Sequence, residues 1–192
     1  MASISSIFAL TAIILLTVPV CAKTAQKPGV RGKVDIKAPP NIVWDAVHKE
    51  RAEDPDLSYS KVLETHGDKV MLEQKFKGMP IIGEATCLLE QEETINKRID
   101  YKLVRSDKFK ELSGSWILTA KPNGVTSLEL QSRLHTGLPF SEAIINHILK
   151  GRIQKRLERV KASAERIVAA TAMTSVTPLP TPSLARVRTE AE

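Results

Sequence analysis

The chain has 192 residues, of which 42% are hydrophobic and 26% are charged, as in an ordinary soluble protein of one domain with tails. Its net charge of +6 could favour an anionic membrane surface or nucleic acid. Only 4% of the residues are aromatic and no nucleic-acid-binding motif is present, so we exclude nucleic acid as a partner and attribute the charge to solubility.

The N-terminus resembles an export signal. An apolar run from Ile7 to Val18 is too short to span a bilayer but suits the central region of a signal peptide. Ala22 then offers a small residue at position −1 and Val20 a tolerated one at −3, which allows cleavage after Ala22. We therefore predict a signal peptide over residues 1–22 and export to a periplasm or the extracellular space. No Lys or Arg precedes the apolar run, so an uncleaved N-terminal membrane anchor remains the alternative.

The next segments alternate between breaks and short elements. Residues 23–30 carry Lys, Gln, Pro and Gly and are predicted to form a linker. Val34 and Ile36 share one face of a strand at 33–37. A helix is predicted to begin at Asn41 or the prolines before it, and the segment 53–56 ends that region with a turn.

Six further strands are predicted from alternating polarity. Turn residues separate them, including an Asn-Gly pair at 123–124 that favours a hairpin. Apolar and charged side chains alternate so regularly around Tyr101 that we expect an antiparallel sheet with one solvated face. The predicted strands cover residues 59–65, 69–76, 83–92, 95–104, 111–120 and 125–134.

The last element is a long amphipathic helix, predicted from Ser141 to about Ala170 because apolar residues recur every three or four positions. Its other side is basic, and we interpret this side as solvated, with peripheral membrane contact as an alternative. These basic residues are Lys150, Arg152, Lys155, Arg156, Arg159 and Lys161. The folded domain is expected over 31–172, followed by a disordered tail at 173–192.

Three segments resemble START-like domains of the polyketide cyclase/dehydrase and coenzyme Q-binding type, within the SRPBCC superfamily. They are VDIKAPPNIVWDAV at 34–47, KFKELSGSWILTAKPNGVTSLEL at 108–130 and GLPF at 137–140, and the likeness extends over about 31–170. The resemblance implies an α+β helix-grip fold, in which a curved antiparallel sheet of six or seven strands wraps around a long C-terminal helix. It also implies a cavity for a hydrophobic ligand.

No catalytic or metal-binding constellation is apparent. The four histidines lack metal-ligand spacing, and His48 and His66 are expected to be exposed. No phosphate-binding or nucleophile-elbow motif is present, and we predict no cofactor. Cys87 is interpreted as a small buried hydrophobe.

The candidate ligand-binding residues lie on the expected inner face. Gln74, Tyr101 and Ser132 share this face with apolar neighbours, so each needs a polar partner, either within the protein or on a ligand. The apolar turn at 78–82 is interpreted as a lid, a partner surface or packing onto the helix. The full candidate set is Leu72, Gln74, Phe76, Met79, Tyr101, Leu103, Trp116, Leu118, Leu130, Ser132, Phe140, Ile144 and Ile148.

We therefore expect a non-catalytic protein that binds or carries a lipid, quinone or isoprenoid. A cyclase or dehydratase acting on a polyketide-like substrate is the alternative, with Tyr101 or His147 as acid or base. A module that contacts a membrane or a partner protein is a third possibility. The oligomeric state is left open.

Overall fold

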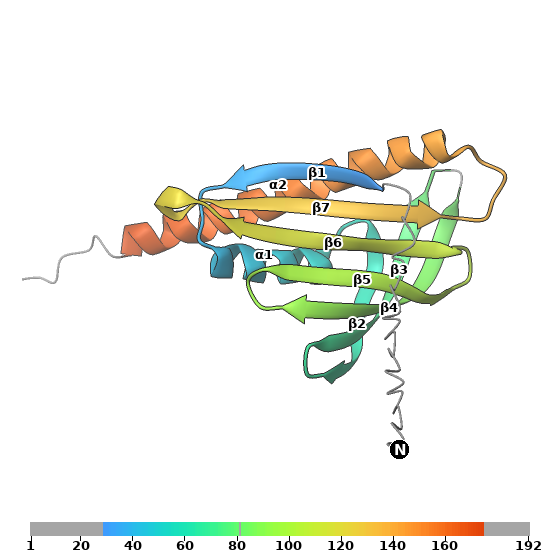
Figure 1. The fold of residues 1–192 in the computed structure, drawn as a ribbon, viewed down its shortest axis with the longest axis horizontal. Helices are drawn as coiled ribbons and strands as arrows, with labels where there is room; N and C mark the ends of the chain where they lie inside the picture. Colours follow the sequence, from blue (N-terminus) through green and yellow to red (C-terminus); the bar gives the residue numbers. More distant parts are fainter. Residues whose placement is uncertain (1–28, 81, 175–192) are drawn as a thin grey trace, which may run out of the picture.

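The computed structural model describes residues 29–80 and 82–174, so the predicted signal peptide, most of the linker and most of the tail lie outside the described residues. Seven strands, two helices and one short 3-10 turn follow one another (Figure 1). They are β1 (Val30–Ile36), α1 (Pro40–Glu53), β2 (Leu57–His66), β3 (Lys69–Met79), β4 (Gly83–Thr94), β5 (Arg98–Ser106), β6 (Glu111–Ala120), η1 (Pro122–Gly124), β7 (Thr126–His135) and α2 (Glu142–Thr174).

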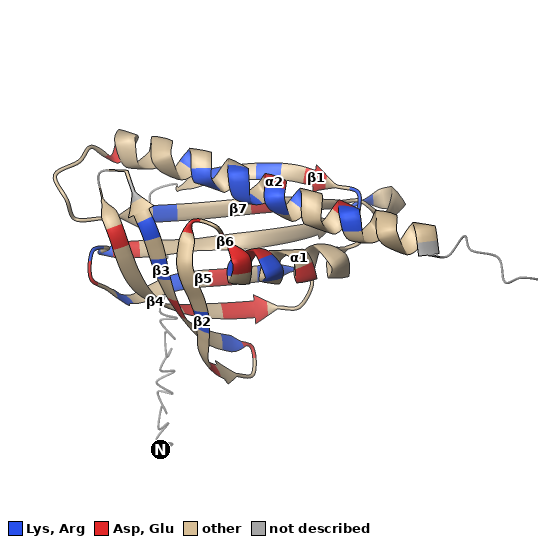
Figure 2. Ribbon diagram, turned by 180° about the vertical axis from the view of Figure 1, so that it is seen from behind, with Lys and Arg blue, Asp and Glu red and all other residues tan. Residues whose placement is uncertain are grey.

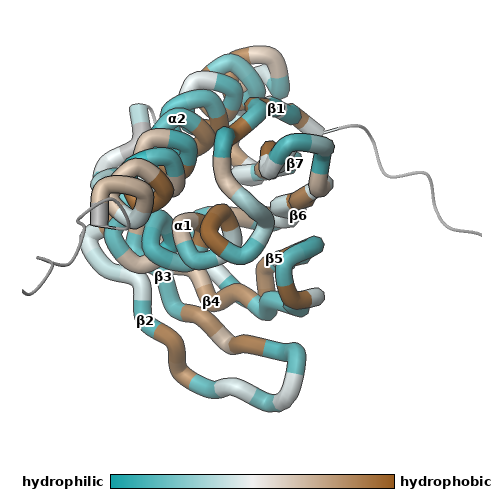
Figure 3. The backbone as a smooth tube through the Cα atoms, turned by 90° about the vertical axis from the view of Figure 1, so that its left-hand side faces the viewer, coloured by the Kyte–Doolittle hydropathy of each residue, from teal (hydrophilic) through white to brown (hydrophobic). Residues whose placement is uncertain are grey.

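The strands form one sheet in the order β1-β7-β6-β5-β4-β3-β2. Every neighbouring pair is antiparallel, so β2 to β7 form a meander and β1 joins its far edge beside β7. Figure 3 shows the sheet curving around both helices, which lie on its concave side. The predicted α+β helix-grip fold is confirmed.

Several boundaries differ from the predicted ones. Residues 95–97 form a turn, and β5 begins at Arg98 because Asn96 adopts a φ of 59° that a strand does not allow. Asn tolerates this left-handed conformation better than most residues. The N-terminal strand already begins at Val30, inside the predicted linker, and α2 continues to Thr174.

The core lies between the concave face of the sheet and the helices. One cluster joins α1 and α2 to β1, β5, β6 and β7, and a second joins β3, β4 and β6 to the start of α2. Gly32 allows α2 to lie directly on β1, because a Cβ there would be 2.7 Å from Cγ2 of Ile153 and 2.9 Å from Cδ1 of Leu157. Neither described helix is long and apolar enough to cross a membrane.

Candidate ligand-binding cavity

A cavity lies between the concave face of the sheet and the two helices. Its volume is about 80 Å³, and both aromatic and polar side chains line it. Six of the candidate residues from the sequence lie in its wall: Gln74, Phe76, Tyr101, Trp116, Leu130 and Ser132. Strands β3, β5, β6 and β7 supply these six side chains, so the alternation of each strand brings them to one face.

The other candidate residues lie elsewhere. Leu72 and Leu118 are buried in the two core clusters, and Leu103 and Phe140 pack at the edge of the cluster around β3 and β4. The side chain of Met79 lies outside the described residues. Ile144 is 44% exposed, which contradicts its expected place in the cavity wall, and Ile148 is half-buried outside that wall.

The helix presents a different stripe to the cavity from the one expected. Leu149 and Ile153 line the cavity, and Ile145 packs into the core cluster around β3 and β4. The stripe that faces the sheet therefore lies about one residue, or about 100° around the helix axis, from the stripe that contains Ile144. Apolar residues occur at 144, 145, 148 and 149, so the sequence did not show which of them face the sheet.

The three polar candidates have partners within the protein. Gln74 donates from Nε2 to Oγ of Ser60 over 3.1 Å, and the Tyr101 hydroxyl lies 3.4 Å from the carbonyl oxygen of Gln131. Burial raises the pKa of Tyr101, although a hydrogen bond with Ser132 opposes the rise. The phenol therefore stays protonated and can donate a hydrogen bond at neutral pH.

Charged residues gather where α2 passes the end of α1, and four of them, Asp54, Asp56, Arg152 and Arg156, line the cavity. We call this group the α1–α2 ion cluster, and it consists of Arg152, Arg156 and Arg159 on α2 with Glu50, Asp54 and Asp56 (Figure 2). Nη2 of Arg159 lies 2.6 Å from a carboxylate oxygen of Glu50 and 2.9 Å from one of Asp54, and Arg152 lies 3.2 Å from Asp56.

The ion cluster corrects the interpretation of the basic helix face. Its arginine side chains are only 20–30% exposed and are paired with carboxylates, so that interpretation is wrong for them. Lys150 and Lys155 are exposed, as expected for a solvated face. The arginines at 152, 156 and 159 and the carboxylates at 50 and 54 have helical spacing, which was a signal that each set lies on one face.

His48 also departs from expectation, because it lines the cavity instead of lying exposed. Its Nε2 lies 3.1 Å from a carboxylate oxygen of Glu93, and its Nδ1 lies 2.9 Å from the carbonyl oxygen of Trp44. Arg51 donates from Nη1 to the same carboxylate over 2.8 Å. These contacts tie α1 to β4 at the wall of the cavity.

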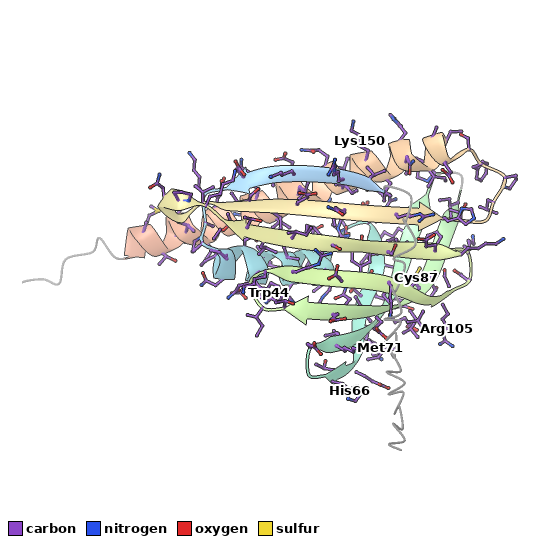
Figure 4. The ribbon with its side chains drawn as sticks, viewed as in Figure 1. Trp44, His66, Met71, Cys87, Arg105 and Lys150 are labelled. Carbon is purple, nitrogen blue, oxygen red and sulfur yellow. The ribbon has the colours of Figure 1, made fainter. Side chains whose placement is uncertain are left out.

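The remaining histidines lie at the surface. His66 is exposed, as predicted, but it is the last residue of β2 and lies beside the turn, not in it (Figure 4). His135 is exposed, and so is His147, which does not line the cavity. Of the two acid–base candidates, only Tyr101 therefore lies in the cavity wall.

Two further interpretations can be compared with the structure. Cys87 is fully buried on β4, and burial raises the pKa of its thiol to about 11, as expected of an unreactive small hydrophobe. Ile82, in the apolar turn, is 5% exposed and packs in the cluster that includes Ile145, which favours packing over a lid. Within 29–80 and 82–174, no group of His, Cys, Asp and Glu could hold a metal ion.

Comparisons with solved structures agree with this architecture. The aromatase/cyclase ZhuI from Streptomyces sp. R1128 is 18% identical, with a TM-score of 0.61 over 74% of this chain and 96% of that one. A protein from Thermus thermophilus is also 18% identical, with a TM-score of 0.58 over 76% and 99% of the two chains. A START superfamily protein from Mycobacterium smegmatis is 14% identical, with a TM-score of 0.59 over the same shares.

At these identities the similarity establishes the fold alone. No curated protein matches the sequence. A family model described as "Polyketide cyclase / dehydrase and lipid transport" matches residues 27–165. The match covers most of the chain and includes both helices except the end of α2, so this protein belongs to the polyketide cyclase/dehydrase and lipid transport family.

Proposed function

We propose that the protein binds or carries a hydrophobic small molecule, such as a lipid, quinone or isoprenoid, in the cavity between the sheet and α2. The observation that supports this most is the wall of the cavity, where Phe76, Trp116 and Leu130 surround a space that the core leaves unfilled. Polar and charged residues line the rest of the wall, so the apolar and aromatic part of it supports an apolar occupant oriented by a few polar groups.

The ligand must enlarge this space. Pockets for small organic ligands usually measure roughly 300–1,000 Å³, several times the present volume of about 80 Å³. The sheet is held by backbone hydrogen bonds between all seven strands, whereas α2 packs against it through side chains. We therefore propose that α2 moves outward when the ligand binds.

The test is mass spectrometry of the purified protein under native conditions, followed by solvent extraction. We expect a co-purifying apolar molecule, and we expect Ser132→Phe to abolish its retention because the ring fills the cavity. Ser113→Phe is the matched control, since residue 113 lies on the opposite face of β6 from Trp116. Equal retention by both variants would show that the ligand binds elsewhere.

An enzymatic function is a second candidate, favoured by the buried hydroxyl of Tyr101 in the cavity wall. ZhuI, which shares the fold, is named an aromatase/cyclase. A protonated phenol could act as a general acid on a polyketide-like substrate. Tyr101→Phe should then abolish turnover while leaving substrate affinity largely unchanged. Turnover that survives this substitution excludes Tyr101 as the acid.

We also propose that the chain is exported through residues 1–22. The apolar run, the small Ala22 at position −1 and the tolerated Val20 at −3 support cleavage after Ala22. N-terminal sequencing of the protein from its native host should therefore begin at Lys23. A mature chain that still begins at Met1 would support the membrane-anchored alternative.

A further inference from the structure

Strand β2 forms one edge of the sheet and is the least covered of the seven strands. In the part of the chain that the structure describes, no strand pairs with its outer side. Leu57 is its one buried residue, and Tyr59, Val62 and Leu63 are between 40% and 47% exposed. Figure 3 shows the far end of β2 and β3 standing clear of both helices. An edge strand with exposed apolar side chains offers a surface on which a further strand can pair.

A β-bulge in the middle of β2 determines which of its side chains share a face. Lys61 lies opposite Glu73 of β3, and Glu64 lies opposite Met71. Because Glu73 and Met71 are only two residues apart, Leu63 is the extra residue of the bulge. Residues three apart lie on opposite faces of a regular strand, whereas here the bulge brings Lys61 and Glu64 to the same, convex face of the sheet.

This arrangement is complementary to a second copy of itself. In an antiparallel pair of β2 strands related by a two-fold axis through the bulge, Lys61 lies opposite Glu64 of the second copy, and Glu64 lies opposite its Lys61. Ser60 likewise meets Thr65 of the second copy, and both of these side chains belong to the concave face. Each bulge adds one residue to its own strand, so the two strands stay in step through the contact.

The same two charges disfavour other strands as partners. A lysine on an edge strand opposes pairing with an unrelated strand, because its ammonium group would lose water without gaining a counter-charge. Lys61 and Glu64 are both exposed in the single chain, so each can take a new partner. A second copy of β2 supplies the opposite charge at both positions, which makes it the partner that this edge fits.

We propose that the protein forms a homodimer in which β2 pairs antiparallel with β2 of a second copy, so that the two seven-stranded sheets become continuous. The contact is a single strand pair and therefore small, and its dissociation constant should be roughly 1–100 µM. None of the ten described residues of β2 lines the cavity, so the dimer does not depend on a ligand.

Sedimentation velocity of the purified protein, over a concentration series that spans this range, tests the proposal. We expect the wild-type chain to change from monomer to dimer along the series. Lys61→Glu and Glu64→Lys each place like charges opposite one another twice in the symmetric dimer, so each should raise the dissociation constant by at least about tenfold. An equimolar mixture of the two variants should restore the dimer, because every glutamate at these positions then faces a lysine.

Lys33→Glu is the matched control. It makes the same charge change at an exposed position of β1, the opposite edge of the sheet, and should leave the dimer intact. Restoration of the dimer by mixing also shows that both variants are folded. A wild-type chain that stays monomeric throughout the series overturns the proposal, as does a dimer that persists in both variants or a mixture that stays monomeric. Loss of the dimer in Lys33→Glu alone would place the contact on β1 and would also overturn it.

Discussion

Gly114 on β6 gives the ring of Tyr101 its place over the sheet. A Cβ at this position would collide with the Tyr101 hydroxyl and with the carbonyl oxygen of Gln131 on the neighbouring strand. Gly114→Ala must therefore displace Tyr101 from the cavity wall, and we expect the free energy of unfolding to fall by about 1–3 kcal/mol. Urea unfolding of the variant measures this loss.

Gly151→Ala on α2 is the matched control, because a Cβ at that position meets nothing within 4 Å. Alanine is a better helix former than glycine, so the free energy of unfolding of this variant should rise by about 0.5–1 kcal/mol. The change from glycine to alanine is thus expected to lower the free energy of unfolding at position 114 and to raise it at position 151. A loss at Gly151 as large as that at Gly114 would show that the Tyr101 contact is not the cause.

Side-chain direction could be predicted from the sequence on the strands but not on the long helix. Alternation with a period of two assigns each strand residue to a face, so Gln74, Tyr101 and Ser132 were placed correctly on the inner face of the sheet. On α2, apolar residues cover more than one stripe, and Ile144 was placed on the wrong one. The position of His48 depends on Glu93, which is distant in the sequence and gave no local signal.

Between elements, the α1–α2 ion cluster fixes how the long helix lies beside the short one. Arg159 donates hydrogen bonds to Glu50 and Asp54, whose side chains are only 7% and 4% exposed. Arg159→Met leaves both carboxylates short of a partner in a poorly hydrated site. We expect the free energy of unfolding to fall by about 2 kcal/mol, the contribution typical of hydrogen bonds to charged groups. Chemical denaturation provides the measurement.

Lys49→Met is the control for this prediction. Lys49 pairs with Glu53 at 3.9 Å, but the two side chains are 57% and 67% exposed. Solvent screens such a pair, so its loss should change stability by less than about 0.5 kcal/mol. If the free energy of unfolding falls equally in both variants, the burial of Glu50 and Asp54 does not strengthen the cluster.

The partners at 50 and 159 are too far apart in sequence for the pairing itself to be predicted.

At the scale of the whole molecule, the order of the strands and the two helices followed from the sequence, while the size of the cavity did not. Turn residues and alternation determine a meander, and one long amphipathic helix suits its single apolar face. The cavity volume depends on how closely α2 approaches the sheet. That distance is set by contacts such as Gly32 against Ile153, which have no local signature in the sequence.

A sheet paired along all seven strands and a helix held by side chains should respond differently to a ligand. Butylbenzene serves as the probe, and the cavity of about 80 Å³ must enlarge to hold it. We expect α2 to move outward and so provide the additional volume. Hydrogen-exchange mass spectrometry should then show slower exchange on α2 around Leu149 and Ile153 once the probe is bound. Strands β6 and β7 are paired with a neighbour on both sides, so the exchange rates of their amides should not change. Altered exchange confined to β6 and β7 would instead mean that the sheet opens and that α2 is the fixed wall.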